Sequence, residues 1–113
     1  MEELKQIYIY MWEAVLINDF DYLRTIIDPQ FSITFSDKDW PLETCFGYLP
    51  NHHIHHVTHE RIDLVPEETC VILKAQTKLT FMNSQPDQWL TIHLSGEKIN
   101  GRWQIISGTL KQQ

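Results

Sequence analysis

Five histidines within eight residues are the most unusual chemical feature of the sequence. Imidazole nitrogens bind zinc and related metals, but only where the ring positions suit one coordination sphere. A helix would place four of them on one face, whereas a strand would divide them between its two sides. No second cluster of ligand residues accompanies them, so we expect no metal and no other cofactor. The five are His52, His53, His55, His56 and His59.

A single histidine beside a carboxylate would support acid–base chemistry instead. If residues 54–65 form a strand, Ile54 and Ile62 share a side with His56 and Glu60. In a desolvated cavity, His56 with Glu60, or with Asp37 after an earlier strand, would then be a candidate catalytic pair. The alternative is a buried His56 whose ring nitrogens are satisfied by neighbours. The sequence leaves open whether the protein is an enzyme.

Other familiar chemistries lack their signatures. The serines do not lie in the glycine frame of a nucleophile elbow, and no glycine-rich phosphate loop is present. The net charge of −6 disfavours nucleic acid and anionic membranes as partners. The first residues lack a basic segment followed by an apolar one, and no apolar run is long enough to span a membrane. We therefore expect a cytoplasmic protein, with Cys45 and Cys70 as unpaired thiols.

The elements that would position these groups can be read from the hydrophobic periodicity. Apolar residues at three- and four-residue spacing predict a helix from about residue 2 to 17, and Asp19 can cap a second, shorter one. Alternation then predicts a strand over 31–36, a turn at 37–39 and a short helix that begins at Pro41. The clearest strand covers 71–81. At 113 residues, and with no internal linker, one domain over 1–113 is expected.

The last stretch predicts a β-hairpin around Asn100-Gly101, the dipeptide that best tolerates a type I′ turn. Pairing Ile99 with Arg102 would place Gly96 opposite Ile105 and Leu94 opposite Ser107. One face of the hairpin would then join the core, including Trp103. The other face would form a dimer surface, since a patch of exposed aromatic and apolar residues usually forms part of a protein–protein interface. That surface comprises Trp89, His93, Ile106 and Leu110.

Helices followed by antiparallel strands define an α+β domain. Three segments carry a resemblance to a known group of proteins: Asn18–Leu23 with its capping aspartate, the Asp28–Phe31 approach to the first strand, and Asn100–Ile106. With these segments the whole chain resembles the nuclear transport factor 2-like superfamily, which includes SnoaL-like, lumazine-binding-like and ketosteroid-isomerase-like domains. The resemblance implies a curved antiparallel sheet wrapped as a cone around the long helix, cystatin-like, with two shorter helices. It also implies an apolar pocket and a homodimer formed through the outer sheet face.

The sequence patterns and the resemblance leave three functions open. The first is a homodimeric domain that binds a small apolar or aromatic molecule in the cone pocket. The second is an isomerase-, cyclase- or dehydratase-type enzyme that uses a pocket histidine with a carboxylate. The third is a protein-interaction module that uses the outer sheet face. The residues expected to line the pocket are His56, Trp40, Tyr48, Tyr8 and Trp103.

Overall fold

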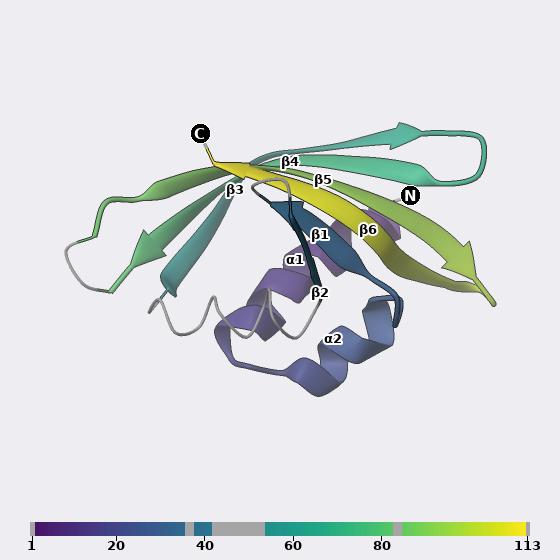
Figure 1. The fold of residues 1–113 in the computed structure, drawn as a ribbon, viewed down its shortest axis with the longest axis horizontal. Helices are drawn as coiled ribbons and strands as arrows, with labels where there is room; N and C mark the ends of the chain where they lie inside the picture. The colour runs from purple at the N-terminus through teal and green to yellow at the C-terminus, as the bar shows by residue number, and fades with distance from the viewer. Residues whose placement is uncertain (1, 36–37, 42–53, 83–84, 113) are drawn as a thin grey trace.

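Two helices lie on the same side of one sheet in the computed structural model, which describes residues 2–35, 38–41, 54–82 and 85–112 (Figure 1). Helix α1 covers Glu2–Leu16 and helix α2 covers Phe20–Ile26. Asn18 separates them in the left-handed conformation, with φ of 59°, which asparagine tolerates better than most residues. The carboxylate of Asp19 accepts a hydrogen bond from the backbone N–H of Tyr22 and caps α2. The first two predicted helices and the predicted cap are confirmed.

In the described residues the sheet has six strands, in the order β2-β1-β6-β5-β4-β3. Strands β3 to β6 follow one another as antiparallel neighbours, as predicted, but β1 pairs in parallel with β6. The parallel pair arises because the chain leaves α2 alongside β6, where the N–H of Asp28 donates to the carbonyl of Ile105 at 2.9 Å. The strands are β1 Ser32–Phe35, β2 Lys38–Pro41, β3 Ile54–Pro66, β4 Val71–Phe81, β5 Gln88–Ile99 and β6 Arg102–Gln112.

Strand β2 corrects the sequence prediction for this part of the chain. Lys38 and Asp39 were predicted in a turn, yet both lie in β2, paired with Phe35 and Thr34. Pro41 closes this strand, and the rest of the short helix predicted to begin there lies outside the described residues. Cys70 is a free thiol, and Cys45 also lies outside the described residues.

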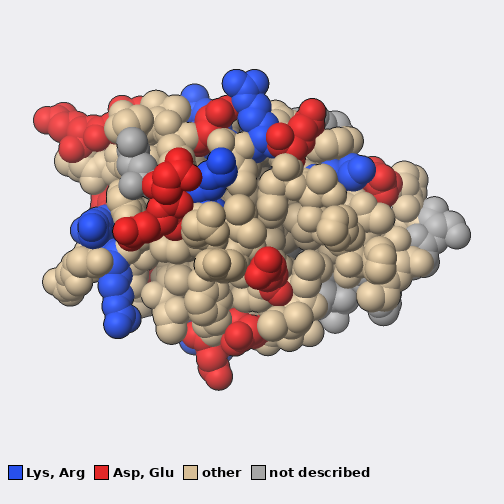
Figure 2. All heavy atoms as spheres, turned by 180° about the vertical axis from the view of Figure 1, so that it is seen from behind, with Lys and Arg blue, Asp and Glu red and all other residues tan. Residues whose placement is uncertain are grey.

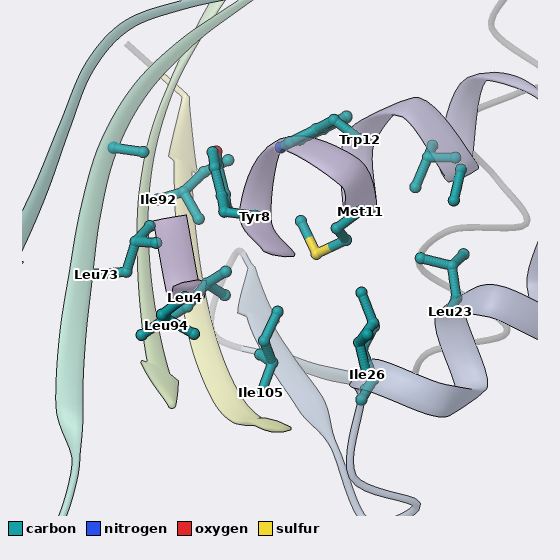
Figure 3. Packing of buried hydrophobic residues seen from close by; sticks show 14 of the residues in the cluster. Leu4, Tyr8, Met11, Trp12, Leu23, Ile26, Leu73, Ile92, Leu94 and Ile105 are labelled. Carbon is teal, nitrogen blue, oxygen red and sulfur yellow. The ribbon is translucent and has the colours of Figure 1, made fainter. Parts of the chain in front are cut away.

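The core lies between α1 and the inner face of the sheet (Figure 3). Side chains at three- and four-residue spacing on α1 meet the inward-facing residues of β4 and β5, as helical and strand periodicity require. Gly96 permits the closest approach, because a Cβ there would lie 2.8 Å from both terminal methyl carbons of Leu4. Buried residues that make this contact include Leu4, Tyr8, Met11, Trp12, Val15, Leu73, Ala75, Ile92 and Leu94.

The terminal hairpin turns at Asn100 and Gly101, both with positive φ, as predicted. The predicted register holds from Ile99–Arg102 to Gly96–Ile105. A β-bulge then inserts one residue into β6, so Leu94 pairs with Gly108 and not with Ser107. The side of the sheet that each later residue of β6 faces is therefore reversed from the prediction.

Candidate functional site

Two β-bulges decide which histidines of β3 face the core. The register against β4 shifts between Ile54 and His56 and again between His59 and Arg61. Each bulge adds one residue, so the alternation of sides is inverted between the two. His56 therefore lies opposite Thr80 and is exposed, and its predicted place inside the cone is wrong. The unbroken alternation assumed from the sequence does not exist here.

His59 occupies the interior position instead. It pairs with Thr77 of β4, whose side chain is 0 % exposed. Thr77 Oγ1 lies 3.1 Å from His59 Nδ1 and 2.8 Å from the hydroxyl oxygen of Tyr8 on α1. The rings of Tyr8 and His59 also touch, with centroids 5.2 Å apart. A helix and two strands thus bring three polar side chains into one hydrogen-bonded chain.

Trp12 adds a fourth polar group. It follows Tyr8 by one helical turn, so both side chains project from the same side of α1. Figure 3 shows the indole nitrogen on the edge of the Trp12 ring nearest Tyr8. This N–H is buried and meets no acceptor with hydrogen-bond geometry within the described part of the chain, although it lies near enough to the Tyr8 hydroxyl to lower the pKa of that group. A buried donor without a partner is uncommon and costs about 1–3 kcal/mol, which makes it a marker for a missing oxygen or nitrogen atom.

Burial controls the ionisation of this cluster. Loss of hydration raises the pKa of Tyr8 to about 12, against the opposing influence of Thr77 and Trp12. Burial also lowers the pKa of His59; the charge of Glu13 opposes this change and that of His56 adds to it. At neutral pH the tyrosine hydroxyl keeps its proton and the imidazole is uncharged. The site therefore consists of neutral hydrogen-bonding groups.

The structure separates the other residues predicted for this site. Trp103 packs against the core but pairs with Lys98, eight residues along β5 from Leu90, the partner of Thr77. At about 3.3 Å per residue this is about 26 Å, so Trp103 does not share a site with Tyr8. Glu60 is exposed at the second bulge of β3.

The side chains of the remaining predicted site residues lie outside the described part of the chain. Asp37 and Tyr48 lie outside the described residues, as do His52 and His53. Trp40 lies in β2, but its side chain is outside the described part of the chain.

Three site residues were missed by reasoning from the sequence. The sequence predicted Thr77 only as part of the strand over 71–81, His59 only as part of the histidine-rich stretch, and Trp12 only as part of the first helix. The sequence carries one signal for Thr77, since it is the one polar residue in the inward row of β4. That row reads Val71, Leu73, Ala75, Thr77, Leu79 and Phe81.

The histidine cluster does not form a metal centre in the part of the chain that the structure describes. Across residues 2–35, 38–41, 54–82 and 85–112, no group of three or more His, Cys, Asp or Glu side chains could hold a metal ion. His55 and His56 are exposed, whereas His59 points toward α1. The bulges thus divide these three histidines between the two faces of the sheet.

The outer face of the sheet is more polar than the sequence indicates. Leu110 pairs with Ile92 and packs against the core, so its predicted place on the dimer surface is wrong; the bulge in β6 causes the change. Trp89 stays on the outer face, where the ammonium of Lys78 lies 5.7 Å from its ring centroid. A hollow of about 540 Å³ lies nearby on this face. It is lined by Glu60, Arg61, Asp63, Lys74, Ala75, Gln76, Thr91 and His93.

Charges of both signs are mixed over one face of the molecule. Seen from behind the view of Figure 1, acidic and basic side chains are interspersed among large uncharged areas (Figure 2). This face has no extended basic patch of the kind that binds a phosphate backbone. None of the helices in the described residues is long and apolar enough to cross a membrane.

The arrangement of α1 against a curved sheet is that of the nuclear transport factor 2-like fold. A protein of this type from Cytophaga hutchinsonii superposes with a TM-score of 0.83 at 14% identity, over 99% of this chain and 97% of that chain. The S. rosetta CaMKII hub gives 0.82 at 12% identity, over 99% and 95% of the two chains. The association domain of C. elegans CaMKII gives 0.81 at 12% identity, over 97% and 93%. The predicted fold is confirmed.

Comparison of sequences adds nothing to this assignment. No protein-family model matches the chain, and neither does any curated protein. At these identities the structural similarity defines the fold alone, and a shared fold leaves the chemistry to be argued from the site.

Proposed function

We propose that this protein is a cytoplasmic, homodimeric domain that binds a small apolar or aromatic molecule between α1 and the inner face of β3 and β4. The unpartnered indole N–H of Trp12 carries the proposal. Burying that donor without an acceptor is unfavourable, so a ligand oxygen or nitrogen placed against it would stabilise the folded protein. The polar groups beside it, Tyr8 and His59, would orient the ligand.

The surroundings favour a ligand with an apolar body. Ile54 and Leu79 are buried on the same inner face, and Val57 and Phe81 pack against the core nearby. Binding sites for small molecules combine such a lining with a few polar groups that select orientation. An aromatic or alicyclic ring with one carbonyl or carboxyl oxygen fits this description.

A fragment screen followed by NMR tests the ligand proposal. Aromatic ketones and carboxylates would be added to protein in which the four indole N–H signals are resolved, and the Trp12 signal should move downfield on binding. The variant Trp12→Phe keeps most of the ring volume and removes the donor, so it should lose affinity. Trp89→Phe on the outer face is the matched control and should bind like wild type. Equal affinity in both variants would reject the site.

The outer sheet face supports the homodimer. The register places Trp89 and Lys78 toward one end of this face and Val65 and Ile72 toward the other. Between the two ends lie charged residues of opposite sign, including Arg61 and Asp63, which form an exposed ion pair at 2.7 Å. A two-fold axis that lies in the interface plane, perpendicular to the strands, would bring unlike ends and unlike charges together. The hub and association domains among the similar structures support self-association of this fold.

Sedimentation at several protein concentrations tests the dimer. Trp89→Asp should shift the equilibrium toward monomer, because it places a charge in the interface. Ile17→Asp is the control, since Ile17 is 73% exposed at the end of α1. A Trp89→Asp protein that remains dimeric would exclude this face.

Acid–base catalysis is a second candidate, favoured by the position of His59. Its imidazole is half-buried, uncharged at neutral pH and within the influence of the Glu13 carboxylate. These are properties that the sequence prediction assigned to His56. Exchange of the α-hydrogens of a bound ketone for solvent deuterium would test it, with loss of exchange expected in His59→Gln. Exchange at the wild-type rate in that variant would exclude His59 as the base.

A further inference from the structure

Thr77 has one hydroxyl hydrogen and two hydrogen-bond partners. Its oxygen lies 2.8 Å from the Tyr8 hydroxyl and 3.1 Å from His59 Nδ1. It can donate to one of them only and must accept from the other. The orientation of the Thr77 O–H bond therefore fixes the direction of both hydrogen bonds, the one to Tyr8 on α1 and the one to His59 on β3.

With uncharged His59, one direction satisfies the hydroxyl groups of both Tyr8 and Thr77. Tyr8 donates to Thr77, Thr77 donates to Nδ1 of His59, and the ring hydrogen of His59 resides on Nε2. Both hydroxyl hydrogens have acceptors in this arrangement, as buried hydroxyl groups require.

A proton on Nδ1 of His59 reverses the direction of these hydrogen bonds. The imidazolium must donate to Thr77, Thr77 then donates to Tyr8, and the Tyr8 hydrogen has to find another acceptor. Tyr8 is 0 % exposed, and no other residue that the structure describes offers it one. Its neighbour on the helix, the indole N–H of Trp12, is itself a donor. Protonation thus adds a second buried donor without a partner, one turn along α1 from the indole N–H of Trp12.

We propose that Tyr8, Thr77 and His59 form a reversible relay that couples ligand binding to the uptake of one proton. A ligand oxygen placed between Tyr8 and Trp12 would accept from both donors and so stabilise the reversed chain. The proton comes from solvent and resides on His59 Nδ1, while Tyr8 keeps its own proton throughout. The relay rests on the geometry of the free protein; only its link to a ligand rests on the proposed function.

The charges around His59 are compatible with this coupling. Glu13 on α1 favours the imidazolium, whereas His56 on the same strand and burial oppose it. Tyr8, which packs against the ring, is neutral in both states. None of these groups supplies the acceptor that the reversed chain lacks, so a ligand oxygen has a specific place to act.

The relay is tested first in the ligand-free protein, by NMR titration of the His59 ring. Thr77→Val removes the donor that stabilises the uncharged ring, so the pKa of His59 should rise. Tyr8→Phe should also raise it, because reversal no longer leaves a hydroxyl without an acceptor. Thr77→Ser keeps the hydroxyl and should restore the wild-type titration. Thr80→Val, opposite His56 on the outer face, should leave the titration unchanged.

The sign of the change in the pKa of His59 shows in which direction the hydrogen bonds run. A lower pKa in Thr77→Val would mean that Thr77 accepts from His59 and would overturn the relay. An unchanged pKa in both Thr77→Val and Tyr8→Phe would mean that burial alone sets the titration, and would also overturn it.

Benzoate and benzylamine then test the link to binding, by calorimetry in buffers of different ionisation enthalpy. Benzoate should bind wild type with uptake of a proton and gain up to about tenfold in affinity per pH unit as the solution is acidified, and this gain should vanish in Thr77→Val. Benzylamine, a donor, should not bind. Benzoate binding without proton uptake would overturn the coupling. Failure of benzoate to bind, with the titrations as expected, would instead count against the proposed function while the relay stands.

Discussion

A double-mutant cycle on Tyr8 and Thr77 would measure how strongly the buried polar chain stabilises the protein. Both side chains are 0 % exposed, and their oxygens are 2.8 Å apart. Tyr8→Phe removes one hydrogen bond and leaves the Thr77 oxygen without a donor, which should lower the free energy of unfolding by about 1–2 kcal/mol. Thr77→Val preserves shape but strands the buried Tyr8 hydroxyl, so its cost should be about 2–3 kcal/mol.

The double variant should cost much less than the sum of the two. With both oxygens gone, no buried hydroxyl is left unsatisfied, and apolar groups of similar shape replace the pair. We expect about 1–2 kcal/mol for the double variant and a coupling energy of about 2 kcal/mol. Urea unfolding followed by fluorescence and circular dichroism gives each free energy, provided that the denaturant slope stays constant.

In the control cycle, Thr80→Val is used in place of Thr77→Val. Thr80 also lies on β4, but on the other face, opposite His56. Tyr8→Phe and Thr80→Val should add to within about 0.5 kcal/mol, since they share no partner. If Tyr8→Phe and Thr77→Val are equally additive, the hydrogen-bonded chain does not act as a unit and the reasoning fails.

Three further predictions concern the fold and its pH dependence. Gly108→Ala should destabilise the protein by about 1–3 kcal/mol in urea unfolding, because the new Cβ would lie 2.4 Å from Leu94 Cδ2, whereas Ser107→Ala should change stability by no more than about 0.5 kcal/mol. The pKa of His59 is lowered on folding, so the unfolded chain binds the proton more tightly and stability should fall as the pH drops below 6.5, the ordinary pKa of histidine. Asp19→Ala should cost about 1 kcal/mol, measured by thermal unfolding, because the cap of α2 is lost.

Each of these has an outcome that contradicts it. Wild-type stability in Gly108→Ala would show that Leu94 can move aside at no cost. The slope of stability against pH should be smaller in His59→Gln but not in His55→Gln, because His55 is exposed; equal slopes would exclude His59 as its source. An Asp19→Ala protein as stable as wild type would mean that the cap bond contributes nothing.

The sequence by itself determined the features that depend on neighbouring residues. The turn at Asn100-Gly101 follows from the tolerance of these residues for positive φ, and the two helices follow from their apolar periodicity and the Asp19 cap. The long strand β4 follows from strict alternation. The resemblance in three short segments extended these local features to the whole fold.

Tertiary structure alone decided which side chains meet. Two bulges in β3 place His59, and not His56, against Tyr8, and one bulge in β6 turns Leu110 into the core. A bulge leaves no mark in the alternation of residue types when the strand carries mixed polar residues, because either register buries a comparable set. The pairing of β1 with β6 likewise joins segments far apart in the sequence. The fold was therefore predictable from local patterns, whereas the site depends on single-residue shifts that only the packed sheet selects.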